Sequence, residues 1–297
     1  MSDATPRLGY IGTGLMGAPM TARLLEAGHA VTIWNRSAEK MAPLIDQGAV
    51  AADSPKAVAE ASDIVMMCLT AAPAVRAVTF GEAGLIEAAD RTKILVDFSS
   101  MRPDLTREWA TELRETSGMG WIDAPVSGGV PGAVAGTLAI MAGGTEQDFE
   151  RAAPVVAHLA SRFTLMGPNG AGQTTKLANQ IVSACTMMVV AECLSFADKA
   201  GVDAGRIPEA LAGGFADSIP MQLFGPRFVA ETYEPKFGAI ETLIKDLDTI
   251  WDVAREAKAP IPMTTQCLEL MRILSNKGLD DQDLTVLTRL FNKREMN

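Results

Sequence analysis

The sequence predicts an α/β protein in two parts: an N-terminal doubly wound, mainly parallel sheet, and an all-α C-terminal domain joined to it by a long helix. Up to about residue 165, short apolar runs alternate with helical patterns, which is typical of βαβ units. Beyond Gly172 the strand signals nearly vanish. The glycine-rich segment Gly167–Gly172 separates the two patterns. We therefore expect domains at residues 1–168 and 169–297.

The strands of the first part are expected where apolar runs are bounded by Gly, Asp, Ser or Pro. They are Leu8–Ile11, Ala30–Trp34, Asp63–Leu69, Ile94–Phe98, Trp121–Asp123, Leu138–Met141 and Phe163–Leu165. The helical patterns of the second part are Gln173–Ala200, Pro208–Gly213, Met221–Ala230, Ile240–Lys258, Met263–Asn276 and Asp283–Arg294.

The first of these helices would be roughly 40 Å long at 1.5 Å per residue. Its polar faces are few, so we expect it to be packed on several sides, including against a second subunit in a homodimer or homotetramer. Its most apolar stretch, Ile181–Ala197, contains Glu192 and several hydroxyl residues. We interpret it as a buried helix that is too short and too polar to span a membrane.

Charge and cysteine usage narrow the class of protein. The formal net charge of −10 argues against nucleic acid or an anionic membrane surface as a partner. Cysteines 68, 185, 193 and 267 form no CxxC pair and have no histidine at metal spacing, so no metal site is expected. Scattered thiols and the absence of an export signal over residues 1–7 predict a cytoplasmic protein.

A glycine motif follows the first predicted strand. Leu8–Ile11 leads into Gly12-Thr13-Gly14-Leu15-Met16-Gly17 and then into a helical pattern. Between a strand and a helix, such glycines allow a tight turn and a close backbone approach to a pyrophosphate at the helix N-terminus. This context predicts a Rossmann-type dinucleotide site at Gly12, Gly14, Leu15, Met16 and Gly17. The alternative is a plain turn between strand and helix.

The residues after the second strand indicate which dinucleotide binds. A carboxylate there would accept a hydrogen bond from the ribose 2′-hydroxyl and favour NAD. The chain has Asn35-Arg36-Ser37 instead, and a guanidinium is a natural partner for phosphate oxygens. We predict that NADP(H) is preferred, while NAD(H) stays open. Three ordinary polar loop residues are the alternative.

Two further segments carry candidate chemistry. The Ser127-Gly128-Gly129 turn follows a strand, and its successive N–H groups could bind a substrate carboxylate. Taken alone, a simple strand-to-helix turn explains it equally well. Lys176 lies near the positive end of the long helix, where its charged form is mildly disfavoured, and is the candidate for proton transfer. Asn179 and Gln180 follow it and could hold a substrate hydroxyl; a surface lysine is the alternative.

Together these motifs resemble the β-hydroxyacid dehydrogenase family, which includes 3-hydroxyisobutyrate dehydrogenases and tartronate semialdehyde (2-hydroxy-3-oxopropionate) reductases. The resemblance extends over nearly the whole chain and rests on residues 12–20, 123–129 and 167–180 and on Lys245-Asp246-Leu247. It implies a reversible hydride transfer between nicotinamide and a short 3-hydroxy acid or β-semialdehyde. It also implies that Lys176 is catalytic and that Ser127–Gly129 binds the substrate carboxylate.

The resemblance assigns further cofactor contacts as well. Leu69 and Thr70 match the loop that passes the cofactor, although the family often has proline where Thr70 stands. Ser100 matches a hydroxyl residue near the nicotinamide, and Lys245 matches a second lysine there.

One departure from the family bears on the substrate. Many members have asparagine four residues after the catalytic lysine, where this chain has Gln180, and Lys176-Leu177-Ala178-Asn179-Gln180 is similar to tartronate semialdehyde reductases. That substrate is therefore expected first, with 3-hydroxyisobutyrate, serine or threonate as alternatives. An imine reductase, or a cofactor-binding module without catalysis, also stays open, although Lys176 favours an enzyme of the first kind.

Overall fold

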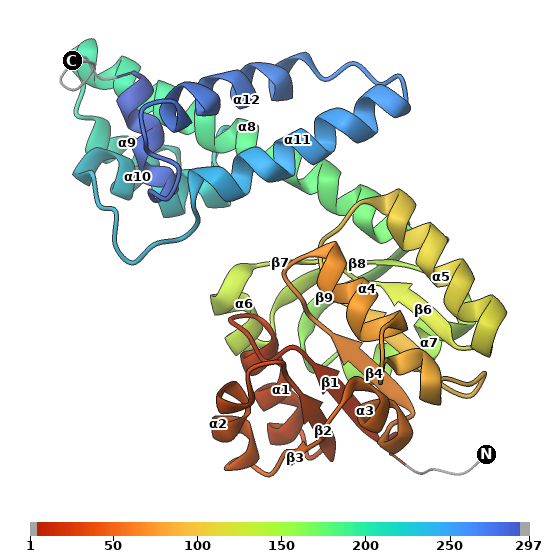
Figure 1. Cartoon of the computed structure of the whole chain (residues 1–297). Helices are drawn as coiled ribbons and strands as arrows, with labels where there is room; N and C mark the ends of the chain where they lie inside the picture. The colour runs from red at the N-terminus through yellow and green to blue at the C-terminus, as the bar shows by residue number, and fades with distance from the viewer. Residues whose placement is uncertain (1–4, 292–297) are drawn as a thin grey trace. The chain divides into compact units, whose positions relative to one another are not determined.

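The computed structural model describes residues 5–291. The chain forms two compact units, Met1–Lys176 and Leu177–Asn297, and the division falls inside one long helix, α8 (Ala171–Lys199) (Figure 1). The domain boundary expected from sequence, between residues 168 and 169, lies just before this helix.

The first unit is built on one sheet. Its strands are β1 Leu8–Ile11, β2 Val31–Trp34, β3 Val50–Ala51, β4 Ile64–Met67, β5 Ile94–Asp97, β6 Gly120–Asp123, β7 Val126–Ser127, β8 Leu138–Gly143 and β9 Ala160–Gly167. The spatial order is β3-β2-β1-β4-β5-β6-β8-β7, and β9 pairs with β8. The pairs from β3 to β6 are parallel, as is β8 with β9, while β8 runs antiparallel to β6 and β7. The predicted doubly wound, mainly parallel sheet is thus confirmed.

Helices cover both faces of this sheet because its strands are apolar on both sides. They are α1 Gly17–Glu26, α2 Ala42–Ile45, α3 Pro55–Ala61, α4 Ala72–Phe80, α5 Pro103–Ser117, α6 Gly129–Ala135 and α7 Glu146–Val156, with short 3₁₀ turns at Ala38–Met41 and Leu85–Ala88.

Alternating residues of each strand enter two separate cores. In β4, Ile64 and Met66 join the core under α1, α2, α6 and α7, whereas Val65 and Met67 join the core under α3, α4 and α5. All four side chains are almost completely buried. Burial on both faces explains why the strands read as continuous apolar runs in the sequence.

The strands β3 and β7 were not predicted from the sequence. Each has only two residues, which is too short for a periodic signal. The antiparallel pairing of β7 with β8 places Ser127 opposite Ala139, directly before α6 begins at Gly129. The Ser127–Gly129 segment therefore starts in a strand pair and ends in a helix.

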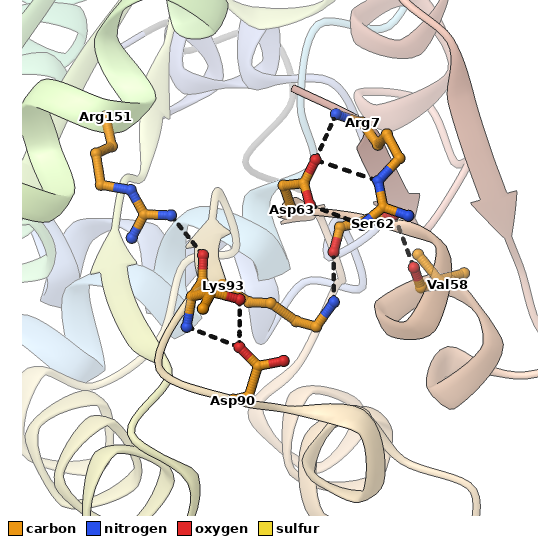
Figure 2. Close-up of polar contacts among 8 residues, drawn as sticks. Arg7, Val58, Ser62, Asp63, Asp90, Lys93 and Arg151 are labelled. Atoms are coloured by element: carbon orange, nitrogen blue, oxygen red, sulfur yellow. Dashed lines mark hydrogen bonds and ion pairs between the residues drawn. The ribbon is translucent and has the colours of Figure 1, made fainter. Parts of the chain in front are cut away.

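Polar contacts tie the amino-terminal edge of the sheet together (Figure 2). The guanidinium of Arg7 contacts the carboxylate of Asp63 at 2.8 Å, just before β4. Lys93 is almost buried before β5, and its Nζ donates to the Ser62 carbonyl at 2.8 Å. Arg151 of α7 donates to the Thr92 carbonyl at 2.6 Å. The Lys93 and Arg151 side chains thus satisfy backbone carbonyl groups at the edge where the parallel strands begin.

The second unit is helical, as predicted. After α8 come α9 Ile207–Leu211, α10 Ile219–Ala230, α11 Ile240–Glu256 and α12 Pro262–Ser275, with 3₁₀ turns at Ala204–Arg206 and Leu284–Leu290. Buried residues of α8, α10, α11 and α12 share one core, in which Met187, Met188 and Met271 are almost inaccessible. The helix expected at Asp283–Arg294 is instead the short 3₁₀ turn, and residues 292–294 lie outside the described residues.

Helix α8 corrects the expectation about membrane spanning. Counted from Ala171 to Lys199 it has 29 residues and an 18-residue window with a mean hydropathy of 1.6, so by length and composition it could cross a membrane. The estimate from Ile181–Ala197 was wrong because the helix continues beyond that stretch at both ends. Within residues 5–291 it is the one helix that meets these criteria, and 44% of that window is buried inside the protein. Packing against α10–α12 is a sufficient reason for its apolar character.

Candidate active site

The loops that carry the predicted cofactor residues of the first unit leave from one edge of its sheet. Because β1, β2, β4 and β5 are parallel, the loops that follow them leave from the same edge. These loops carry Gly12–Gly17, Asn35–Ser37, Leu69–Thr70 and Ser100. The strand order reverses between β1 and β4, and such a reversal at the carboxyl ends of strands is where open α/β sheets bind ligands.

The glycine turn between β1 and α1 has a different need for each glycine. Gly12 has φ +93°, and a Cβ there would lie 2.4 Å from the Cys68 carbonyl oxygen. A Cβ at Gly17 would lie 1.8 Å from the Gly12 carbonyl oxygen, so only glycine lets the helix start this close to the strand. At Gly14 an added Cβ would meet nothing within 4 Å. The space over Gly14 is thus open to a ligand that approaches the backbone closely.

In the loop after β2, Asn35 makes hydrogen bonds within the protein, whereas Arg36 is exposed; the sequence did not reveal this difference. The carboxamide of Asn35 accepts from the Thr13 N–H at 3.1 Å and donates to the Ser37 carbonyl at 2.9 Å. Asn35 thereby holds the glycine turn against its own loop. Arg36, in contrast, is exposed, and Ser37 is half-buried. Of the three predicted 2′-phosphate residues, Arg36 is the one whose charge faces solvent.

The loops after β4 and β5 are joined to each other. The Leu69 N–H donates to Ser99 Oγ at 2.9 Å, and Ser99 is buried. Thr70 and Ser100, the two neighbouring predicted residues, are exposed. The exposed hydroxyls of Thr70 and Ser100 therefore lie next to Leu69 and Ser99, whose hydrogen bond joins the two loops.

The Ser127–Gly129 turn has the backbone conformation that its sequence suggested. Gly128 has φ +127° and Gly129 has φ +59°, values that residues with a Cβ rarely adopt. A Cβ on Gly128 would also lie 3.2 Å from the Leu138 side chain. Gly128 and Gly129 are exposed, and successive N–H groups of a turn of this kind can form a site for an anion.

Lys176 is the sixth residue of α8, and its side chain is half-buried. In the second unit, Asn179 Nδ2 donates to Gln180 Oε1 at 3.1 Å, and Gln180 Nε2 donates to Asp246 Oδ2 at 2.9 Å. Lys245 Nζ lies 3.4 Å from Asp246 Oδ1. Asp246, on α11, therefore connects the predicted residues Gln180 and Lys245, and sequence analysis gave it no role.

Two buried carboxyl groups near the carboxyl edge were also missed. Asp97 ends β5 and Asp123 ends β6. Burial raises the pKa of Asp97 to about 7, with a further increase from the charge of Asp123, while hydrogen bonds from Ser99 oppose it. Burial likewise raises the pKa of Asp123, against N–H groups of Gly170 and Gln173 that lower it. The available sequence signal was an aspartate as the last residue of two apolar strands.

Known proteins resemble both units. Residues 7–167 match the NAD binding domain of 6-phosphogluconate dehydrogenase, and residues 170–291 match the family described as NAD-binding of NADP-dependent 3-hydroxyisobutyrate dehydrogenase. The 2-hydroxy-3-oxopropionate reductase of Escherichia coli is 40% identical over 287 residues, covering 95% of this chain and 96% of that protein. This chain belongs to the 3-hydroxyisobutyrate dehydrogenase family. The resemblance noted from the sequence motifs is confirmed.

Other members of this family agree. A probable 3-hydroxyisobutyrate dehydrogenase-like protein of Arabidopsis thaliana is 38% identical, covering 86% of this chain and 78% of that protein. A Mycobacterium tuberculosis 3-hydroxyisobutyrate dehydrogenase structure with L-serine superposes with a TM-score of 0.84 at 27% identity, covering 96% of this chain and 99% of that one.

An imine reductase from Pseudomonas sp. reaches a TM-score of 0.62 at 20% identity, a likeness of fold alone.

Family membership makes the chain an NAD(P)-dependent oxidoreductase of the hydroxyacid dehydrogenase class. Among residues 5–291, no group of three or more His, Cys, Asp or Glu side chains could hold a metal ion.

Proposed function

We propose that this protein is an NADP-preferring reductase of 2-hydroxy-3-oxopropionate (tartronate semialdehyde), which it interconverts with glycerate. The observation that carries the proposal is the carboxamide of Gln180, which follows Lys176 by one turn of α8 and is held by Asp246 at 2.9 Å. A fixed amide beside a proton-transferring lysine suits a small, hydroxylated substrate. The 40% identity with the Escherichia coli reductase supports the same substrate.

The glycine turn after β1 fits a dinucleotide. Gly12 and Gly17 leave no room for a side chain, while Gly14 faces open space at the start of α1. A pyrophosphate there would accept hydrogen bonds from backbone N–H groups at the positive end of the helix. Arg36, exposed after β2, would bind the 2′-phosphate of NADP(H) through its planar guanidinium.

The chain's own residues then divide the chemistry. When bound, the nicotinamide supplies or accepts the hydride. The N–H groups of Ser127–Gly129 bind the substrate carboxylate and so orient the carbonyl carbon. The Lys176 ammonium donates its proton to the carbonyl oxygen as the hydride reaches carbon, which yields the hydroxyl group and a neutral amine. The same ammonium stabilises negative charge that develops on oxygen. In the oxidative direction Lys176 accepts the hydroxyl proton.

The test is a set of initial rates with NADPH and NADH, followed by nicotinamide absorbance. The substrates are tartronate semialdehyde and methylmalonate semialdehyde for reduction, and glycerate, 3-hydroxyisobutyrate, serine and threonate for oxidation. We expect the highest kcat/KM with tartronate semialdehyde and NADPH. A higher value with another acid would replace the substrate, and turnover of cyclic imines alone would replace the reaction class.

We also propose that the protein is a cytoplasmic homo-oligomer, a dimer or a tetramer. Along α8 the apolar side chains of Val182, Val189 and Phe196 recur every seven residues and are 66%, 54% and 72% exposed. This spacing puts them in one stripe on the helix, and a second copy of the chain would remove it from water. All four cysteines carry free thiols, which suits a reducing compartment.

A further inference from the structure

The buried carboxamide of Gln173 forms hydrogen bonds with the backbone on both sides of Ser100. Gln173 is the third residue of α8 and only 1% exposed. Its Nε2 donates to the Ser99 carbonyl at 2.7 Å, and its Oε1 accepts from the Met101 N–H at 3.1 Å. Donor and acceptor of the same amide are thus both satisfied by the two residues that flank Ser100.

The backbone of Gln173 is held as firmly as its side chain. Its N–H donates to Asp123 Oδ2 at 3.0 Å, and the N–H of Gly170 donates to Asp123 Oδ1 at 2.8 Å. The first N–H groups of a helix have no partner within the helix, and a carboxylate there is favoured by the helix dipole. Asp123 therefore caps α8 from the end of β6.

Glycines make room for this cap. A Cβ on Gly143 would lie 2.6 Å from Asp123 Oδ1, and a Cβ on Gly172 would lie 2.6 Å from the Asp123 carbonyl oxygen and 2.5 Å from that of Met141. No L side chain could be added at either place without moving the start of α8 or the end of β6. The glycines around Asp123 are therefore needed for the close approach of helix and sheet.

We call the hydrogen bonds that Gln173 makes with Ser99, Met101 and Asp123 the clamp. The clamp is connected to the loop after β4 as well. Ser99, whose carbonyl binds Gln173, accepts the Leu69 N–H on its hydroxyl at 2.9 Å. Its own N–H donates to Asp97 at 2.9 Å. Leu69 and Ser100, two residues predicted to contact the cofactor, are therefore connected through these hydrogen bonds to the turn of α8 that precedes Lys176.

We propose that Gln173 is a positioning residue that holds Ser100 and Lys176 at a set distance from each other, so that the cofactor loop and the proton donor act as one rigid unit. Lys176 follows Gln173 by three residues on the same helix, so a shift of the first turn moves both. The proposal rests on the proposed function of Lys176 and Ser100. A misplacement of about 1 Å is enough to reduce turnover by 10²-fold.

The test compares three variants with the wild-type protein. Gln173→Leu keeps the bulk and removes both side-chain hydrogen bonds. Gln173→Glu keeps an acceptor for the Met101 N–H but places a negative charge against the Ser99 carbonyl. Thr174→Val is the matched control, because the Thr174 hydroxyl donates only to a local backbone carbonyl, that of Gly170 just before α8, at 2.8 Å, and the residue is exposed.

We expect Gln173→Leu and Gln173→Glu each to reduce kcat by about 10²-fold, and Thr174→Val to leave it unchanged. NADPH affinity, measured by fluorescence, should remain within a few-fold, since the glycine turn is untouched. The primary isotope effect with 4-deuterated NADPH should rise, because a misplaced hydride donor makes hydride transfer rate-limiting. A kcat that falls only in proportion to lost folded protein would overturn the proposal.

A double-variant cycle with Ser100→Ala separates positioning from general stability. If Gln173 acts through Ser100, the Gln173→Leu/Ser100→Ala protein should lose less activity than the product of the two single losses. Losses that simply multiply would mean that the two residues act independently, and the clamp would then have no role in catalysis.

Amide hydrogen exchange gives a readout that does not need turnover. The clamp predicts that residues 98–101 and 170–176 lose protection together in Gln173→Leu and keep it in Thr174→Val. Wild-type inactivity on every hydroxy acid and semialdehyde would refute the proposed function while leaving this measurement to decide the clamp. Unchanged protection of residues 98–101 in Gln173→Leu would refute the clamp itself.

Discussion

Asp97 and Asp123 are register partners at the ends of the neighbouring parallel strands β5 and β6, so two fully buried carboxyl groups lie side by side in the sheet. Asp123 has two backbone N–H donors from the start of α8. Asp97 has the Ser99 N–H on one oxygen, while its buried Oδ2 has no hydrogen-bond partner within residues 5–291. Because fewer donors stabilise its charged form, Asp97 holds a proton more easily than Asp123 does.

Asp97 should make the stability of the protein depend on pH. Its pKa is about 7 in the folded protein, against an ordinary value of 3.8 for an aspartate in the unfolded chain, so the folded state binds more protons between these values. The contribution of this carboxyl to stability is fully present below about pH 4 and is lost as the pH rises through about 7. We expect Asp97→Asn to gain thermal stability relative to the wild type as pH increases from 4 to 8.

Thermal melts at several pH values measure this difference, which has an upper bound of about 4 kcal/mol at about 1.4 kcal/mol per pKa unit. Asp53→Asn, at an exposed position, is the control and should show no such trend. A difference between Asp97→Asn and wild type that stays constant with pH would show that Asp97 is ionised throughout.

Lys176→Ala should abolish most turnover without loss of cofactor binding. General acid–base catalysis contributes about 10²–10⁴-fold, so we expect kcat to fall by that amount. NADPH affinity should stay within a few-fold, as titrated by fluorescence. Lys277→Ala removes an exposed lysine after α12 and serves as the control. Activity of Lys176→Ala within about tenfold of wild type would assign proton transfer to another group.

Arg36→Asp should reverse the cofactor preference. Hydrogen bonds to charged groups are worth about 1.5–3 kcal/mol, so we expect NADPH affinity to fall by roughly 10- to 100-fold while NADH affinity changes little. Lys40→Asp, an exposed charge change on the next turn of the chain, controls for the overall field. Equal losses for both cofactors would remove Arg36 from the 2′-phosphate site.

Gln180→Asn should change substrate selection more than turnover in general. The shorter side chain cannot keep the 2.9 Å bond to Asp246 from the same helix position. We expect kcat/KM for tartronate semialdehyde to fall about tenfold relative to a branched semialdehyde such as methylmalonate semialdehyde. Competition assays with both substrates measure the ratio directly. An unchanged ratio would show that the Gln180 amide does not contact the substrate.

Val189→Glu should weaken self-association. The residue lies in the middle of the exposed apolar stripe of α8, where a charge would be buried in the proposed contact between copies. Light scattering over a range of protein concentrations should show a lower molar mass for Val189→Glu than for wild type. Val202→Glu, equally exposed after α8 but outside the stripe, should behave as wild type. The same mass for all three proteins would place the contact elsewhere.

Much of this protein follows from local patterns in its sequence. The strands β1, β2, β4, β5 and β6 carry apolar residues on both faces because helices cover both sides of the sheet, and their ends were predicted to within two residues. Gly12 and Gly17 stand at positions where the backbone leaves no room for a side chain, and this requirement is what the glycine spacing in the sequence indicates. Lys176 was predicted as the proton-transferring residue because it lies near the start of a long helix, after a glycine-rich break.

Only the tertiary structure decided how these motifs are held. Asp123 and Gln173 are 50 residues apart in the chain, and their hydrogen bond exists because β6 ends where α8 begins. Asn35 was expected to face a phosphate, yet its carboxamide holds Thr13, 22 residues away. A periodic pattern records which side of an element is buried. It carries no record of which distant backbone group a buried amide or carboxylate will meet, because that partner is set by the packing of the whole unit.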